Sequence, residues 1–217
     1  MENVKSLRSA FTLIEMLVVM GIIAVLIGAS IGGYSAMTKS AERARSQELV
    51  SNVATALTAL FQNEGVWPKR LLNAADGGSG GGKLLDENAA YALVSNGRSY
   101  FSLTKDGSKL GGHDRFGILT PWAQAVVKRL GSSAGKDSKV GSMTVADHTL
   151  HFALDLDGDG RILGESVGGR SVDVRATAIV WCCGKDGKID PYPYVAGGGG
   201  KTDNVYSWTP AQTRDVQ

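Results

Sequence analysis

Near its start the chain holds one long apolar run, residues 11–31, in which Glu15 is the single charged side chain. As a helix that rises 1.5 Å per residue, this run would extend roughly 30 Å, the thickness of the hydrocarbon core of a bilayer. The polar residues before it include Lys5 and Arg8. A basic flank on the N-terminal side of the run predicts that this end stays in the cytoplasm. We therefore expect a single pass through the inner membrane, spanning to about residue 33, with the remaining chain in the periplasm or outside the cell.

Glu15 distinguishes three interpretations of this run. A cleaved secretory signal would have a shorter apolar segment of about 7–15 residues, with a small-residue cleavage site after it and no carboxylate inside it. A plain signal anchor fits the length, but it leaves unexplained a charge that costs about 3 kcal/mol inside a membrane. Cleavage before the run would instead leave a new amine on Phe11, four residues from Glu15. Only this third interpretation gives Glu15 a role, because its carboxylate could then neutralise the amine of a neighbouring subunit.

Residues 10–15, Ala-Phe-Thr-Leu-Ile-Glu, resemble the prepilin cleavage and methylation motif of the type IV pilin and type II secretion pseudopilin family. That family usually has glycine where this chain has Ala10, but alanine is the next smallest residue, so we still expect processing. The resemblance implies that a prepilin peptidase removes the leader, residues 1–10, and methylates the amine of Phe11. It also implies polymerisation through the N-terminal helix, with Glu15 matched to the Phe11 amine of a neighbour.

A helical pattern continues beyond the apolar run. Val50, Val53, Leu57 and Leu60 recur at a spacing of three to four residues, which predicts one buried helix face. A glycine and a proline soon after residue 64 supply a stop signal. We therefore predict one helix over residues 11–63, about 80 Å long, followed by a globular head over residues 66–217.

The head reads mainly as strands. Residues 149–155 alternate, with Leu150, Phe152 and Leu154 facing the core, and residues 172–181 are rich in Val, Thr and Ile. A short helix is expected over residues 123–130. These elements predict an α+β fold in which the long helix packs on an antiparallel sheet. Residues 77–82 are mostly glycine and, with the lysine that follows, have the spacing of a phosphate-binding loop. That loop would need a strand before it and a Ser or Thr after the lysine, and both are missing. We therefore predict a flexible glycine loop.

Composition argues against several functions. The chain has 23 basic and 21 acidic residues and a formal net charge of +2, whereas a dedicated nucleic-acid binder should show a basic stripe. His148 and His151 lie three residues apart, so in a strand they would point to opposite faces and could not easily share a metal. No nucleophile stands beside an obvious base, and we expect no enzyme activity. The adjacent Cys182 and Cys183 are either packed thiols, which we favour, or a strained vicinal disulfide.

Residues 155–162, Asp-Leu-Asp-Gly-Asp-Gly-Arg-Ile, match the start of a calcium-binding loop. Asp155, Asp157 and Asp159 occupy the first, third and fifth positions, and glycine occupies the sixth. The twelfth position is Ser166, so the usual bidentate glutamate is missing, and Glu165 is the candidate substitute. The alternative is an Asp-Gly-rich turn that binds no ion.

The last part of the chain carries a second resemblance. Residues 184–187 (Gly-Lys-Asp-Gly), a glycine-rich stretch and residues 203–208 (Asp-Asn-Val-Tyr-Ser-Trp) resemble the end of the major pseudopilin of type II secretion. That resemblance implies a calcium ion held by Asp186, Asp203 and the carbonyl of Cys183. The loop here is longer than the family's.

Together these features predict a filament subunit of a type II secretion-like or type IV pilus-like machine. Its expected partners are copies of itself, other pseudopilins, prepilin peptidase, the assembly platform and its ATPase, and the membrane. The alternative from another class is an anchored calcium-binding adhesin or binding protein that does not polymerise.

Overall fold

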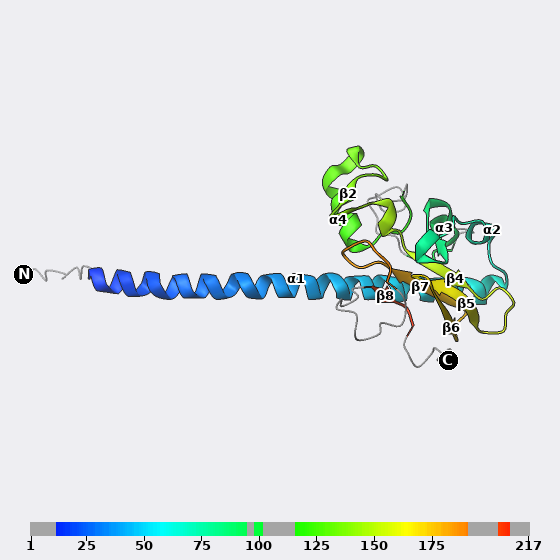
Figure 1. Ribbon diagram of the computed structural model, residues 1–217, viewed down its shortest axis with the longest axis horizontal. Helices are drawn as coiled ribbons and strands as arrows, with labels where there is room; N and C mark the ends of the chain where they lie inside the picture. The colour runs from blue at the N-terminus through cyan, green and yellow to red at the C-terminus, as the bar shows by residue number, and fades with distance from the viewer. Residues whose placement is uncertain (1–11, 95–97, 102–115, 191–203, 209–217) are drawn as a thin grey trace, which may run out of the picture. The chain divides into compact units, whose positions relative to one another are not determined.

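The computed structural model describes residues 12–94, 98–101, 116–190 and 204–208 (Figure 1). The predicted leader, with Ala10, lies outside these residues, as do Phe11 and Asp203. The chain divides into two compact units, Met1–Ala41 and Glu42–Gln217. One helix, α1 (Leu13–Glu64), contributes to both units, which confirms the long N-terminal helix to within two residues at either end.

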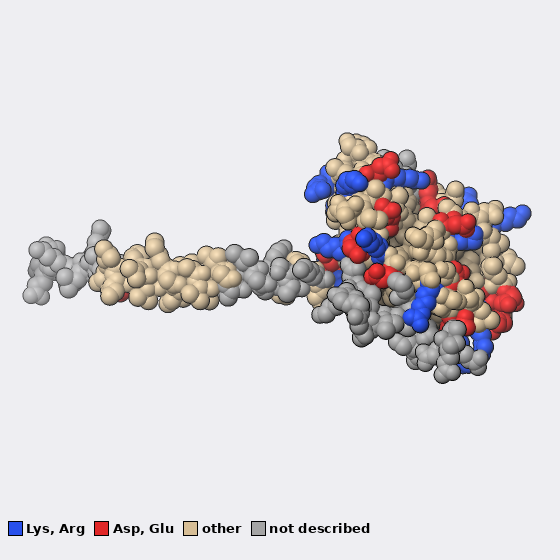
Figure 2. Space-filling model, in the orientation of Figure 1, with Lys and Arg blue, Asp and Glu red and all other residues tan. Residues whose placement is uncertain are grey.

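In the first unit, α1 exposes its apolar side chains. Every large apolar residue described between Leu13 and Ile27 is at least 49% exposed, and Leu13 reaches 83%. Figure 2 shows this part of the helix almost wholly in the colour of uncharged residues, whereas the second unit carries charges of both signs. Within the described part of the chain, we find no helix with both the length and the apolarity needed to cross a membrane.

In the second unit, the C-terminal half of α1 packs on the core. The four residues of the predicted stripe, from Val50 to Leu60, are at most 1% exposed. The helix ends at Glu64, where Gly65 has φ of 69° and donates its N–H to the Phe61 carbonyl at 2.8 Å. A positive φ at this position is easy for glycine, which explains why the helix stops there.

A four-stranded antiparallel sheet lies against this half of α1 (Figure 1). Its order is β1 (Lys83–Leu84), β4 (His151–Leu154), β7 (Ala178–Cys182) and β8 (Val205–Tyr206). The α+β class and the strand at β4 are confirmed. The single strand expected over residues 172–181 is wrong, because the chain turns at residues 175–177 and divides it between β7 and a separate strand, β6 (Arg170–Val174).

The second face of the sheet is covered as well. The hairpin of β5 (Ile162–Val167) and β6 forms an apolar cluster with Trp181 and Trp208. This cover explains why His151, on the face opposite Phe152, is only 6% exposed.

Residues 77–82 also lie over this face, and Gly78–Gly80 form a short 3-10 helix, η1. The Trp181 indole donates to the Gly80 carbonyl at 3.1 Å, and the Nδ1 of His151 lies 2.8 Å from the Gly81 carbonyl oxygen. A Cβ placed on Gly82 would lie 2.6 Å from the Phe152 carbonyl oxygen. The glycines therefore allow close packing of the main chain, rather than the flexibility that the sequence suggested.

The remaining elements surround this core. The short helix predicted near residue 123 is α4 (Pro121–Leu130), which starts with proline in its first turn and packs in a third apolar cluster. Its Trp122 indole donates to the Glu42 carboxylate of α1 at 2.8 Å. The smaller elements are α2 (Lys69–Leu72), α3 (Glu87–Ala92), η3 (Gly131–Ser133), β2 (Lys139–Val140), β3 (Met143–Thr144) and η4 (Ala146–His148).

Candidate functional site

Glu15 has a local partner that the sequence reasoning missed. The main-chain N–H and the hydroxyl of Thr12 both donate to Glu15 Oε2 at 2.9 Å, and the Glu15 N–H lies 3.3 Å from the Thr12 hydroxyl oxygen. This is a capping box, in which Thr12 caps the helix that begins at Leu13. The spacing of threonine and glutamate could have indicated it. Glu15 therefore helps to start α1, in addition to the intersubunit role expected from the motif.

The surface around Glu15 is apolar from Leu13 to Ile27. Apolar side chains exposed over this length are normally covered by lipid or by other protein. The exposed large apolar residues described in this unit are Leu13, Ile14, Met16, Leu17, Val18, Val19, Met20, Ile22, Ile23, Val25, Leu26, Ile27 and Met37.

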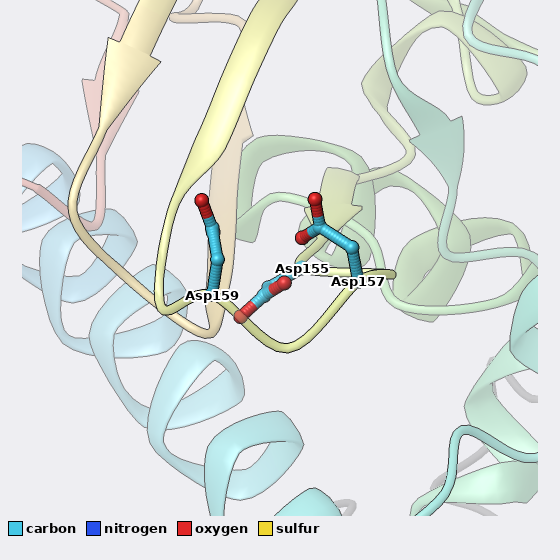
Figure 3. Close-up of side chains that lie close together, drawn as sticks. All are labelled: Asp155, Asp157 and Asp159. Atoms are coloured by element: carbon cyan, nitrogen blue, oxygen red, sulfur yellow. The ribbon is translucent and has the colours of Figure 1, made fainter.

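In the second unit, the chain brings together the three aspartates of the first predicted calcium loop. Each of Asp155, Asp157 and Asp159 offers a carboxylate oxygen, and these atoms lie within 4.8 Å of one another (Figure 3). Asp155 is buried, whereas the other two are exposed. Like charges this close repel one another, so a cation among them would be stabilised.

The turn itself is closed around Asp155. Its two carboxylate oxygens accept the N–H groups of Gly158 at 2.7 Å and Gly160 at 2.8 Å. Both glycines have positive φ, 80° and 78°, in open space. The main chain therefore folds back on the first carboxylate, and this places Asp157 and Asp159 beside it.

The loop is fixed to the end of α1 through Trp67. The Trp67 indole donates to the main-chain carbonyl of Asp155 at 2.6 Å, and the Asp155 N–H donates to the Thr177 carbonyl at 2.9 Å. Trp67 stacks on Phe61 of α1, with ring centroids 4.6 Å apart. No sequence pattern indicated this contact, because Trp67 lies 88 residues from its partner.

The donor set fits a hard cation only in part. Carboxylate oxygens are the ligands that Ca²⁺ prefers, and three are present. The substitute ligand considered from the sequence is not among them: Glu165 Oε1 instead accepts the N–H of Gly82 at 3.0 Å. Further oxygens would have to come from the main chain or from water.

The second predicted loop is described only in part. Asp186 is exposed and accepts the Lys188 N–H at 3.0 Å, whereas its expected partner Asp203 lies outside the described residues. Next to Asp203, the buried Oδ1 of Asn204 meets no hydrogen-bond donor among the residues that the structure describes. A buried oxygen of this kind fits a cation ligand, so the second loop remains a candidate.

Comparison with known proteins gives one match. Residues 5–31 match the family model described as the prokaryotic N-terminal methylation motif, which is the prepilin-type cleavage and methylation motif of type IV pilin and pseudopilin families. The match contains Ala10, Phe11 and Glu15. No curated protein and no solved structure matched the chain. The chain therefore carries the prepilin-type processing motif, which supports its identification as a type IV pilin-like or pseudopilin precursor.

Proposed function

We propose that this chain is a structural subunit, a pseudopilin, of a type II secretion-like or type IV pilus-like filament. In this proposal prepilin peptidase cuts between Ala10 and Phe11, and the mature chain starts with N-methyl-Phe11. The observation that carries the proposal is the motif at residues 5–31 together with the exposed apolar side chains of α1 that follow it. The motif marks a family of structural proteins that are generally not enzymes.

Assembly follows from the chemistry of α1. An apolar helix surface is stable in lipid and is equally stable against the same surface of another copy, so subunits can pass from the membrane into a filament core. Inside that core the Phe11 amine is positively charged, and an unpaired charge in an apolar medium is costly. The Glu15 carboxylate of a neighbouring subunit removes the cost by pairing with it. An assembly platform and its ATPase would supply the energy for extraction from the membrane.

Processing is tested by mass spectrometry of the N-terminal peptide from membrane-extracted protein. The expected peptide begins with N-methyl-Phe11. A mature chain that starts near Ser30 would show ordinary secretion instead, and the filament proposal would fall with it.

Assembly is tested by cross-linking in cells, and the capping box requires two substitutions. Glu15→Gln keeps an oxygen that accepts from Thr12 but removes the charge, whereas Glu15→Ala removes both. Charge pairing predicts that both variants lose most of the cross-linked oligomers while still inserting in the membrane. Glu48→Ala is the matched control, because Glu48 is an exposed glutamate of the same helix outside the motif. Normal oligomers from Glu15→Gln would restrict Glu15 to capping, and normal oligomers from both variants would favour an anchored adhesin that does not polymerise.

We also propose that the second unit binds Ca²⁺. The first loop is supported by the closely spaced carboxylate oxygens of Asp155, Asp157 and Asp159. The second loop is supported by the buried oxygen of Asn204. It is also supported by the resemblance to the major pseudopilin, which implies Asp186 and Asp203 as ligands. In either loop these residues would hold the ion, and the ion would neutralise their charges and cross-link the turn.

Thermal unfolding of the full-length chain in detergent, with millimolar calcium or with chelator, tests this proposal. A ligand at a hundredfold excess over Kd adds about 2.7 kcal/mol, which corresponds to a rise in Tm of about 5–10 °C. Asp157→Ala should abolish the rise if the first loop dominates, and Asp186→Ala if the second does. Asp137→Ala, an exposed aspartate outside both loops, should leave it unchanged. Identical melting curves in calcium and chelator would show that both loops are turns without an ion.

A further inference from the structure

Two cysteines that are adjacent in the chain have different surroundings at the end of β7. Cys182 is part of the apolar cluster that packs against α1. The sulfur of Cys183 instead lies 3.3 Å from Nδ1 of His148 and donates to the Asp147 carbonyl at 3.5 Å. Both cysteines are thiols rather than disulfide sulfurs, and both are fully buried.

This arrangement opposes a bond between the two sulfurs. Successive side chains along a strand point to opposite faces, and a disulfide requires Cβ atoms about 3.5–4.5 Å apart. Cys182 is also fixed in register, because it pairs with Val205 of β8. A bridge therefore needs a change of the main chain at the end of β7 and loss of the contact between Cys183 and His148.

The contact with His148 is reinforced from a third element. The Thr120 hydroxyl lies 3.0 Å from Nδ1 of His148, and the Thr120 N–H donates to the His148 carbonyl at 3.0 Å. Thr120 immediately precedes α4, and its side chain makes no capping bond to that helix. All three side chains are fully buried. Thr120 and His148 therefore hold the start of α4 and η4 against the end of β7.

The turn that follows β7 closes the same site. Gly187 has φ of 77°, and a Cβ on it would lie 2.6 Å from Cβ of Met143 and 3.2 Å from Nε2 of His148. Gly187 therefore packs directly on His148 and Met143. Rotation of Cys183 toward Cys182 would disturb this turn as well as η4.

We propose that the contact between Cys183 and His148 makes the docking of α4 and η4 sensitive to thiol oxidation. While α4 and η4 are docked, the two thiols are kept apart and reduced, even in an oxidising compartment. When these segments detach, Cys182 and Cys183 come within reach of small disulfides. The vicinal disulfide that forms then removes the thiol from His148 and keeps the segments from docking again.

The oxidation is ordinary thiol–disulfide exchange with a low-molecular-weight disulfide such as oxidised glutathione. One cysteine thiolate attacks a glutathione sulfur, which breaks the S–S bond, forms a mixed disulfide and releases one glutathione thiolate. The second cysteine thiolate attacks the protein-bound sulfur of that mixed disulfide and releases the second glutathione. Two protein thiols lose two electrons and two protons, and the small disulfide is reduced to two thiols.

The test uses the full-length chain in detergent. An aromatic disulfide reagent should modify neither cysteine of the native protein and both cysteines in denaturant. Oxidised glutathione should leave the native mass unchanged. Thr120→Val removes the hydroxyl beside His148 and should speed modification about tenfold, as expected for the loss of one hydrogen bond from the closed state. With oxidised glutathione this variant should yield a chain lighter by two hydrogen atoms.

Two controls assign the result. Thr58→Val removes a hydroxyl that donates to the Ala54 carbonyl within α1, so its thiols should stay protected. Cys183→Ser should form no internal disulfide. An internal disulfide in the untreated protein, native thiols that react as fast as unfolded ones, or slow reaction in Thr120→Val would each overturn the proposal.

If Thr120→Val does not fold, the wild-type chain in low concentrations of urea gives a second test. Thiol reactivity must rise together with proteolytic cleavage within α4, because both report detachment of the same segments. Thiol reactivity that rises while α4 remains protected from proteolysis would refute the proposal.

Discussion

Replacing Trp67 tests whether the acidic loop is held by the end of α1. Trp67→Phe keeps an aromatic ring against Phe61 but removes the indole N–H that donates to the Asp155 carbonyl. Asp155 is only 3% exposed, so water cannot easily replace the lost donor. A buried carbonyl left without a donor costs about 1–3 kcal/mol. For a chain of this size, a loss of about 2 kcal/mol corresponds to a Tm lower by about 4–8 °C.

Trp67→Ala separates the hydrogen bond from the packing. It removes the ring as well, and the expected loss of stability rises to about 3–5 kcal/mol. Stacked rings contribute about 0.5–1.5 kcal/mol beyond their burial. A double-mutant cycle with Phe61→Leu should therefore show a coupling energy of this size for Trp67→Ala. The cycle should show little coupling for Trp67→Phe, which keeps an aromatic ring at this position. Urea unfolding followed by circular dichroism measures all of these variants. A Trp67→Phe protein within about 0.5 kcal/mol of wild type would refute the anchoring role of the hydrogen bond.

Three further predictions concern other contacts. Burial lowers the pKa of His151 below its ordinary 6.5. The unfolded chain therefore takes up the proton first, so the contribution of His151 to stability should be full above pH 6.5 and should fall as pH drops through the folded pKa. Tm scans should lose this pH dependence in His151→Gln. Gly82→Ala should cost about 2 kcal/mol more than Gly78→Ala in urea unfolding, because both residues have positive φ but a Cβ meets neighbours only at Gly82. Trp122→Phe should cost about 1 kcal/mol by the same assay, since Glu42 loses its indole donor, and an unchanged midpoint would show that α4 does not depend on this bond.

Local patterns in the sequence predicted those parts of the fold that depend on near neighbours. The spacing from Val50 to Leu60 predicted the buried face of α1, and the alternation around Phe152 predicted β4. The aspartates of the first loop follow one another along the chain, so the sequence alone indicated that they would lie close together.

Features that depend on distant residues were not predicted. The strand expected over residues 172–181 was wrong because a three-residue turn of ordinary composition divides it, and only pairing with β4 and β5 identifies the two parts. The glycine-rich loop gave no sign that it would pack on Trp181, which lies 101 residues from Gly80. Likewise, the link from Trp67 to Asp155 depends on the folded main chain, because the acceptor is a carbonyl that every residue carries.

The capping box at Thr12 has a consequence for maturation. Among the described residues, α1 begins at Leu13, and the Met16 N–H donates to the carbonyl of its capping residue, Thr12. Under the proposed cleavage between Ala10 and Phe11, Thr12 and Glu15 would both stay in the mature chain, so the capping box would survive removal of the leader. The start of the helix is then specified by residues of the mature subunit and not by the segment that the peptidase would remove.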